Sequence, residues 1–204
     1  MSTIGSNTLI ANNLRAHILE TFELLAGLMA FAVIAGLVFA RFSRPTAKIL
    51  YSENAVIAPY RGITAFEFRV ANGRNNQMIE VSAKVLFTRF ENVEGKMMRR
   101  YYMLPLERDN VTFFPLSWTV VHPIDEQSPL KGLTREEMLA SSAEFLILLQ
   151  GIDETFAQNV HSRSSYRTDE IVWNAKFADV FSGMKEKNLT VDMRKFSKIE
   201  KASN

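Results

Sequence analysis

An uncharged apolar run from Leu24 to Ala40 constrains this chain more than any other feature. Its 17 residues would form a helix about 25 Å long, at the short limit for crossing a bilayer. Neighbouring apolar residues lengthen the run to 18–42, although Glu20 and Glu23 fall inside it. A carboxylate in a membrane helix is costly against lipid and favours water or a neighbouring helix. We therefore predict one transmembrane helix over 18–42.

The basic residues of this region follow the apolar run. Arg41, Arg44 and Lys48 come after it, with Pro45 among them. A secretory signal peptide carries a positive leader, whereas the residues just before this run are acidic. The positive-inside rule places the C-terminal domain in the cytoplasm and Met1 outside. The three cations also suit anionic lipid, each gaining about 1 kcal/mol at the membrane surface, but a plain stop-transfer signal explains them equally.

The predicted helix has two patterned surfaces. Small residues recur every four positions, at Ala32, Gly36 and Ala40. This spacing favours close helix packing in an oligomer, although such residues are common in any membrane helix. Phe31 and Phe39 are eight residues apart and share roughly one face, which suits either a helix seam or a lipid contact.

Beyond residue 50 the hydrophobic pattern changes to the period of two that β-strands show. Thr64–Val70 alternates apolar and polar residues, and similar stretches follow it. Short strands at this spacing predict a mainly β domain, built as an antiparallel β-sandwich and preceded by one transmembrane α-helix. The predicted strands cover 64–70, 78–88, 97–106, 111–114, 116–122, 143–150, 155–160 and 171–173.

One short helix and the domain limits complete this interpretation. Thr134 supplies an N-cap, and Glu136 and Glu137 supply first-turn acids, which predicts a helix over 134–140. The charged tail is expected to fray, although 189–191 could add an edge strand. The predicted parts are an N-terminal segment, the transmembrane helix, a linker, the sandwich and a C-terminal tail, at 1–17, 18–42, 43–50, 51–184 and 185–204.

The sequence offers no set of residues that predicts catalysis. It has no cysteine, and its three histidines share no metal-ligand spacing. His122 ends an apolar strand and is interpreted as a hydrogen-bonded strand residue. The paired acids Asp125-Glu126 and Asp153-Glu154 adjoin turns, where turn formation and salt bridges account for them. We therefore predict no enzyme activity, no cofactor and no metal site, and the net charge of +2 gives no indication of nucleic-acid binding.

Several long motifs occur in order over most of the chain. They are Phe39–Pro45 with Ala47–Ile49, Phe68–Asn72 with Arg74–Asn75, Trp118–Leu130, Gly151–Thr155 with Gln158, and Arg163–Ile171 with Trp173. Together they resemble the inner-helix junction and cytoplasmic domain of prokaryotic inward-rectifier potassium channels. The resemblance implies that the cytoplasmic domain is an immunoglobulin-like β-sandwich and that the protein is a homotetramer. It also implies that the potassium ion is the transported species.

The resemblance also implies roles for single residues. The predicted membrane helix matches the inner, pore-lining helix. Glu23 matches an acid near its outer end, Gly27 the hinge glycine, and Phe39 the bulky residue at the gate. Phe31 is apolar where eukaryotic members can carry a polar or acidic residue, which implies weak polyamine block. The three cations after the helix match the region where family members meet anionic lipid.

The family's selectivity filter has a partial counterpart near the N-terminus. Counting back without gaps, the place of the Thr-Val-Gly-Tyr-Gly filter is occupied by Thr3-Ile4-Gly5-Ser6-Asn7. Thr3, Ile4 and Gly5 fit, whereas Asn7 replaces a glycine whose backbone angles few other residues adopt. The segment before the membrane helix is therefore interpreted as a remnant of the filter and outer loop. We expect the chain to be N-terminally truncated or a degenerate relative, because the outer and pore helices should precede this point.

Two functions follow from the sequence. The first is a subunit of an inward-rectifier-type potassium channel in the inner or plasma membrane, whose cytoplasmic domain regulates the inner-helix gate. The alternative is a non-conducting single-pass membrane protein whose β-sandwich binds lipid, a small effector or intact channel subunits.

Overall fold

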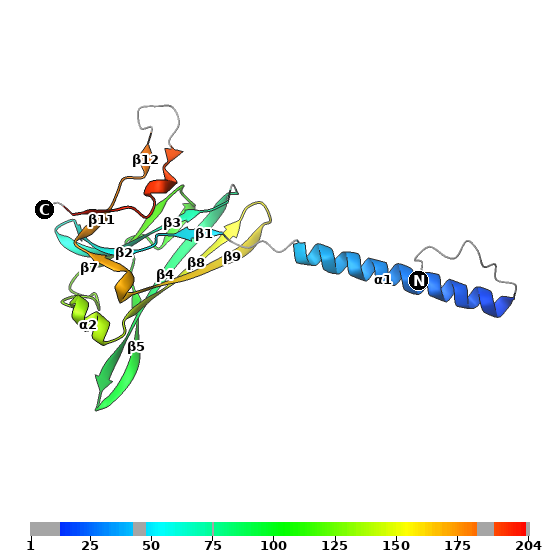
Figure 1. The fold of residues 1–204 in the computed structure, drawn as a ribbon, viewed down its shortest axis with the longest axis horizontal. Helices are drawn as coiled ribbons and strands as arrows, with labels where there is room; N and C mark the ends of the chain where they lie inside the picture. Colours follow the sequence, from blue (N-terminus) through cyan, green and yellow to red (C-terminus); the bar gives the residue numbers. More distant parts are fainter. Residues whose placement is uncertain (1–12, 43–47, 75, 183–189, 203–204) are drawn as a thin grey trace. The chain divides into compact units, whose positions relative to one another are not determined.

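The computed structural model describes residues 13–42, 48–74, 76–182 and 190–202, and the chain divides into two units, Met1–Pro45 and Thr46–Asn204 (Figure 1). The first unit contains the helix α1 (Leu14–Phe42). Asn13 caps this helix, because its Oδ1 accepts a hydrogen bond from the backbone N–H of Ala16 at 2.9 Å. The helix therefore begins four residues before the predicted 18–42 and ends at the predicted residue.

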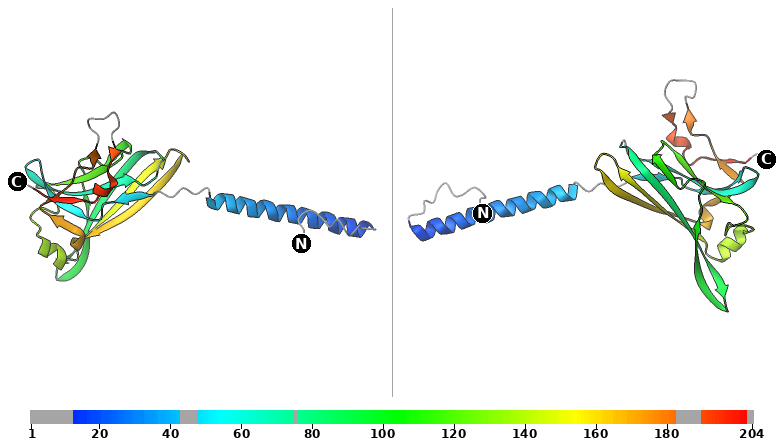
Figure 2. Two further views of the ribbon diagram at one scale, coloured as in Figure 1. Left: turned by 45° about the horizontal axis from the view of Figure 1, so that its top comes forward. Right: turned by 180° about the vertical axis from the view of Figure 1, so that it is seen from behind.

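The second unit is a sandwich of two sheets, as the alternating strands predicted (Figure 2). In the first sheet β3 is central and pairs antiparallel with β1, β2 and β7, while β10 adds to β2 in parallel. In the second sheet the order is β5-β4-β8-β9, and β6 also pairs with β4. The first sheet contains β1 (Ile49–Tyr51), β2 (Ala55–Tyr60), β3 (Ile63–Asn72), β7 (Trp118–Ile124) and β10 (Ile171–Trp173). The second contains β4 (Met78–Val93), β5 (Lys96–Leu104), β6 (Asn110–Phe113), β8 (Glu144–Asp153) and β9 (Gln158–Arg167).

Aromatic side chains join the two sheets in the core. Phe66 of β3 stacks on Phe145 of β8 with 4.1 Å between ring centroids. Phe68 of β3 lies 5.8 Å from Tyr166 of β9, again between ring centroids. All four side chains are buried, and each buried phenylalanine contributes about 2 kcal/mol from removal of apolar surface from water. This interior fixes the two sheets face to face.

A third layer covers the outer face of the first sheet. It contains β11 (Ala175–Phe177) paired with β14 (Ile199–Lys201), and β12 (Phe181–Ser182) paired with β13 (Thr190–Val191). Phe177 packs with Val56 in a second apolar cluster. The expectation that the tail frays is therefore wrong for the described residues 190–202, whose 3₁₀ turn η2 (Met193–Lys195) leads to the buried Phe196.

Two further sequence predictions are wrong in their bounds, and a third is confirmed. The predicted linker 43–50 ends too late, because Ile49 already pairs in β1, and β2 was not predicted. All of Ala55–Ala58 is buried between the core and the third layer, so β2 lacks the alternation of a half-buried strand. The predicted strand 155–160 is split, because β9 begins at Gln158 after a turn. The helix α2 (Arg135–Ala140) is confirmed, with the capping box of Thr134.

Candidate functional site

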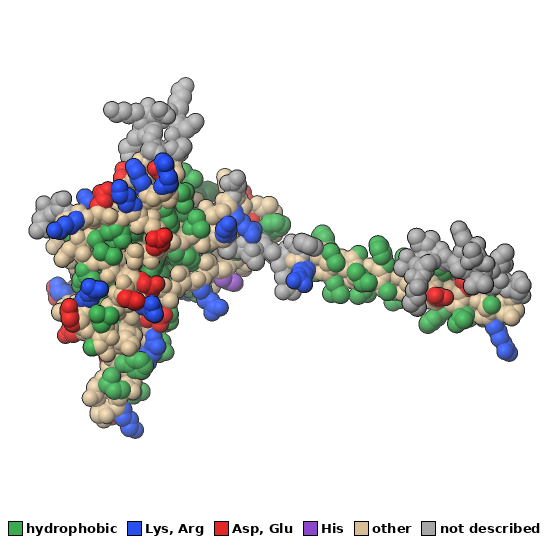
Figure 3. Space-filling model, in the orientation of Figure 1, with side chains coloured by type: hydrophobic (Ala, Val, Ile, Leu, Met, Phe, Trp, Pro, Cys, Tyr) green, Lys and Arg blue, Asp and Glu red, His purple; other side chains and the backbone are tan. Residues whose placement is uncertain are grey.

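Among the described residues, one helix is long and apolar enough to cross a membrane, at Leu14–Arg41, and none of it is buried. Figure 3 shows hydrophobic side chains along this helix and basic side chains near its ends. Glu23, Gly27, Phe31 and Phe39 are separated by multiples of four residues. Such a row is inclined about 26° to the helix axis, so tilted helices can turn it toward a common axis.

The two phenylalanines of this row are available to a partner. Phe31 is 63% exposed and Phe39 is 74% exposed. Gly36 has no neighbour within 4 Å of an added Cβ, which leaves the small-residue face equally open. The pore-lining and gate roles of the row remain predictions, as do the filter-like residues Thr3, Ile4 and Gly5, which lie outside the described residues.

The predicted lipid-binding cations flank the connection between the two units. Arg41 lies in the last turn of α1 and is exposed. Lys48 is exposed immediately before β1, whereas Arg44 lies outside the described residues. The carbonyl of Lys48 accepts a hydrogen bond from the N–H of Gly73 at 2.7 Å. A Cβ on Gly73 would lie 2.8 Å from that carbonyl oxygen, so this contact requires glycine.

Ser52, directly after β1, is the centre of a buried hydrogen-bond network. Tyr166 donates its hydroxyl proton to the Ser52 carbonyl at 2.6 Å, and the two hydroxyl oxygens are 3.0 Å apart. The backbone N–H of Arg69 donates to Ser52 Oγ at 3.1 Å, and Tyr51 donates to Ser162 Oγ at 3.0 Å. These contacts join β1 to both β3 and β9.

The protons of the Ser52 and Tyr166 hydroxyls can be assigned. A tyrosine hydroxyl has one proton, and Tyr166 gives it to a carbonyl, which only accepts. Ser52 must therefore donate to the Tyr166 oxygen, so the two residues exchange two hydrogen bonds. Ser52 is 3% exposed and Tyr166 is 2% exposed. Burial raises the pKa of Tyr166 to about 12, with the Ser52 hydrogen bond opposing this shift, so its proton stays in place at neutral pH.

His122 is the hydrogen-bonded strand residue that the sequence predicted. Its Nδ1 lies 2.6 Å from the Pro105 carbonyl and its Nε2 lies 2.7 Å from Ser128 Oγ. A carbonyl only accepts, so Nδ1 carries the proton and Nε2 accepts from Ser128. Burial lowers the pKa of His122, partly opposed by the Pro105 hydrogen bond and by Asp125. The ring is therefore neutral, and its two nitrogens hold β7 to Pro105 and to the loop at Ser128.

The paired acids lie in turns and accept hydrogen bonds there. Asp125 Oδ1 accepts from the N–H of Gln127 at 3.0 Å. Asp153 Oδ1 accepts from the N–H of Thr155 at 2.9 Å, and its Oδ2 accepts from Asn76 at 2.6 Å. In the described part of the chain no three His, Cys, Asp or Glu side chains group as metal ligands. These acids therefore shape the loops.

The outer face of the second sheet is lined by apolar side chains that the core does not use. On β4 and β8, Leu86 pairs with Leu146 in register, and both are half-buried, as is Leu148. On β5, Tyr101 and Met103 continue this face and are 59% and 60% exposed. We call these five residues the open face. This face has no distinct signal in the sequence, because half-buried leucines in an alternating strand look like core.

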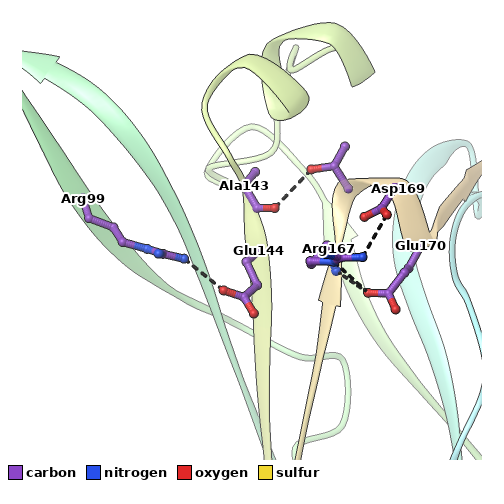
Figure 4. A network of polar contacts seen from close by, with 7 residues as sticks. Arg99, Ala143, Glu144, Arg167, Asp169 and Glu170 are labelled. Carbon is purple, nitrogen blue, oxygen red and sulfur yellow. Dashed lines mark hydrogen bonds and ion pairs between the residues drawn. The ribbon is translucent and has the colours of Figure 1, made fainter.

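Charged side chains border the open face (Figure 4). Arg99 donates to Thr88 Oγ1 at 2.9 Å and to Glu144 Oε2 at 3.0 Å, so it crosses from β5 over β4 to β8. Arg167 of β9 pairs with Asp169 at 3.0 Å in the adjoining 3₁₀ turn η1 (Thr168–Glu170). An apolar centre with a charged border is the usual composition of a protein–protein interface.

A polar hollow lies at the other end of the same sheet. Its volume is about 270 Å³, and its lining includes Glu80, Gln150, Asn159 and His161. Glu80 sits in a β-bulge with φ of 49°, where the β4–β8 register shifts. Gly151 opposite is packed tightly, since a Cβ there would lie 2.9 Å from a methyl carbon of Val81. The bulge turns the Glu80 carboxylate to solvent.

Comparison with known proteins gives one consistent result. A family model for the inward rectifier potassium channel C-terminal domain matches residues 49–204. The inward rectifier potassium channel Kirbac3.1 of Paramagnetospirillum magnetotacticum is 43% identical over 200 residues, covering 98% of this chain and 68% of that protein. The G protein-activated inward rectifier potassium channel 1 of Bos taurus and that of Homo sapiens are each 30% identical over 194 residues, covering 88% of this chain and 37% of each relative.

These matches agree with the observed fold. The family model starts at Ile49, the first residue of β1, and runs through the sandwich and the third layer. The match to Kirbac3.1 extends over nearly the whole chain and so includes α1. The chain therefore belongs to the inward rectifier potassium channel family, as a membrane-embedded channel subunit with a cytoplasmic C-terminal domain.

Proposed function

We propose that this chain gates potassium flow by coupling its cytoplasmic domain to the inner end of α1. The observation that carries the proposal is the position of Phe39 three residues before the end of an apolar helix, with the family's C-terminal domain following directly. The Phe39 phenyl rings of four subunits around an axis would close a pore by excluding water, and Gly27 would let the helix bend. Potassium is the transported ion, and the chain has no catalytic role.

The open face supports assembly into a homotetramer. The third layer covers the outer face of the first sheet, whereas no described element covers the outer face of the second. Leu146 and Leu148 lie at the centre of the open face, and Lys84 and Arg163 lie beside them. We assign the open face to contacts between copies around the pore axis.

Cysteine cross-linking tests the position of the helix row. The chain has no cysteine, so a single Phe39→Cys introduces the only thiol. If Phe39 faces the axis, mild oxidation in liposomes gives disulfide-linked dimers. The control is Leu37→Cys, which lies about 200° around the helix from position 39 and should stay monomeric on a denaturing gel. Equal cross-linking at both positions would contradict the gate assignment.

Introducing negative charges on the open face tests the assembly. Leu146→Asp with Leu148→Asp places carboxylates at its centre, where a desolvated charge disfavours contact. The native mass in detergent is expected to fall from tetramer to monomer. Val172→Asp is the control, because Val172 is exposed on the other sheet. A tetramer that survives the double substitution would assign the contacts to another surface.

The lipid role of Arg41, Arg44 and Lys48 has its own test. Each cation gains about 1 kcal/mol near an anionic surface, so four chains sum to a strong preference. We expect phosphatidylglycerol to change the yield of Phe39→Cys cross-linking, and replacing all three cations by glutamine should remove this change. A triple variant that still responds to the anionic lipid would show that the cations act only as a stop-transfer signal.

A further inference from the structure

The strand that follows the membrane helix is held by side chains as well as by its backbone. β1 pairs with β3 over only Ile49–Tyr51. Tyr51 then donates to Ser162, and Ser52 exchanges two hydrogen bonds with Tyr166, both partners belonging to β9. A short strand has few ladder bonds of its own, so its local stability depends strongly on such contacts.

The partner strand β9 is firmly attached to the second sheet. It pairs with β8 from Arg167↔Glu144 to Gln158↔Asp153, without a register shift. The turn between them carries Phe156, which is 48% exposed. β1 itself pairs with the first sheet, and the hydrogen bonds of Tyr51 and Ser52 to β9 add to the packing of Ile49 and Tyr51 against the shared core. A displacement of β1 therefore reaches β9 directly and, through the ladder, β8.

We propose that the Ser52–Tyr166 pair, supported by Tyr51–Ser162, is the joint that makes β9 and its sheet follow β1. The Ser52–Tyr166 pair is buried and both of its hydroxyl protons are used, which holds one geometry better than apolar packing does. The residues are positioning residues for gating, and only that use rests on the proposed function. The joint itself depends on contacts within the C-terminal domain.

Hydrogen exchange of the full chain tests the joint without reference to conduction. Tyr166→Phe keeps the ring packed against Phe68 and removes only the hydroxyl. We expect the amides of Ile49–Tyr51 to exchange at least about tenfold faster, because the change removes both hydrogen bonds between Tyr166 and Ser52, and the loss of one alone accounts for about this factor. Ser52→Ala should give a smaller increase, because the Tyr166 hydroxyl still donates to the Ser52 backbone carbonyl.

The control for this experiment is Tyr102→Phe. Tyr102 is half-buried in β5, and its hydroxyl donates to Glu91. This variant should leave β1 exchange unchanged. If Tyr166→Phe accelerated the amides of β8 as much as those of β1, the hydroxyl would serve overall stability only, and the joint would be refuted.

A second measurement follows the proposed direction of transmission. Gln158→Cys at the start of β9 carries an environment-sensitive dye, and the protein meets vesicles with or without phosphatidylglycerol. Anionic vesicles should change the dye signal when the joint is intact, and Tyr166→Phe should abolish most of the change without reducing vesicle binding. A full response in Tyr166→Phe overturns the joint. No response in either protein overturns the proposed lipid gating, and the exchange result still decides the joint.

Discussion

The guanidinium of Arg69 lies over the ring of Phe177, with its Cζ 4.8 Å from the ring centroid. This contact joins β3 of the sandwich to β11 of the third layer. Arg69 is 8% exposed, and its Nε lies 3.4 Å from Thr119 Oγ1. Burial lowers the pKa of Arg69, opposed by Asp179 and Glu67, yet the group remains charged because a guanidinium keeps its proton in proteins. A buried cation therefore helps to hold the last strands in place.

The coupling between Arg69 and Phe177 can be measured with a double-mutant cycle. The variants are Arg69→Met, which keeps a long apolar stem, Phe177→Leu, and both together. We expect a coupling free energy of about 1 kcal/mol from unfolding in urea, as for a partly desolvated cation–π pair. A coupling near zero would mean that the two side chains only share space.

Mild acid should destabilise the C-terminal domain through His122. Burial lowers its pKa below the ordinary value of 6.5, so the unfolded chain binds the proton more readily. The stabilisation is present above about pH 6.5 and is lost as pH falls through the lowered pKa. Glu67 acts in the opposite sense, because burial raises its pKa and the folded state takes up its proton first.

Thermal unfolding between about pH 7 and pH 5 checks this linkage. The transition temperature should fall over this interval in the wild-type chain. His122→Gln should be less stable at neutral pH and show a flatter profile, while Glu67→Gln should show a steeper one. An unchanged slope in His122→Gln would assign the dependence to other groups.

Gly73→Ala should loosen the start of the sandwich. The new methyl would meet the Lys48 carbonyl oxygen at 2.8 Å and the Leu50 side chain at 3.1 Å, so the backbone must move. We expect a loss of about 1–3 kcal/mol in the free energy of unfolding of the domain. Gly36→Ala in α1 is the control, because an added Cβ there has no neighbour within 4 Å. Equal stability in Gly73→Ala would show that the contact relaxes freely.

Phe39→Ala should make the closed channel leak. A methyl group cannot exclude water from a constriction as a phenyl ring does, so the barrier to ions falls. Thallium flux into liposomes that carry the assembled channel should rise by at least about tenfold, a barrier change of about 1.4 kcal/mol. Leu37→Ala, on the opposite side of the helix, should leave the flux unchanged. The gate lies elsewhere if both variants behave alike.

The sequence predicts this fold well where its pattern matches the local environment. The strands β3 and β4 alternate because one face meets the core, and the Thr134 capping box marks α2 directly. β2 was not predicted because it is buried on both faces. Of the third layer, the sequence indicated only the edge strand at 189–191, which β13 confirms for 190–191, because the strands of this layer are two or three residues long. Spacing alone places Phe31 and Phe39 on roughly one face of the helix, whereas the selection of Glu23 and Gly27 rests on the family resemblance. The Ser52–Tyr166 contact cannot be read from spacing, since it joins residues 114 positions apart in the chain.

The parallel pairing of β10 with β2 has a consequence for biosynthesis. β2 follows closely after the membrane helix, whereas its outer partner Ile171–Trp173 comes near the end of the chain. A nascent chain therefore presents β2 with one edge unpaired while its helix already lies in the bilayer. Unpaired strand edges invite pairing with other chains, and chains emerge at about 5–20 residues per second. The interval before β10 leaves the ribosome is therefore the period in which β2 is most prone to pair with a strand of a neighbouring chain.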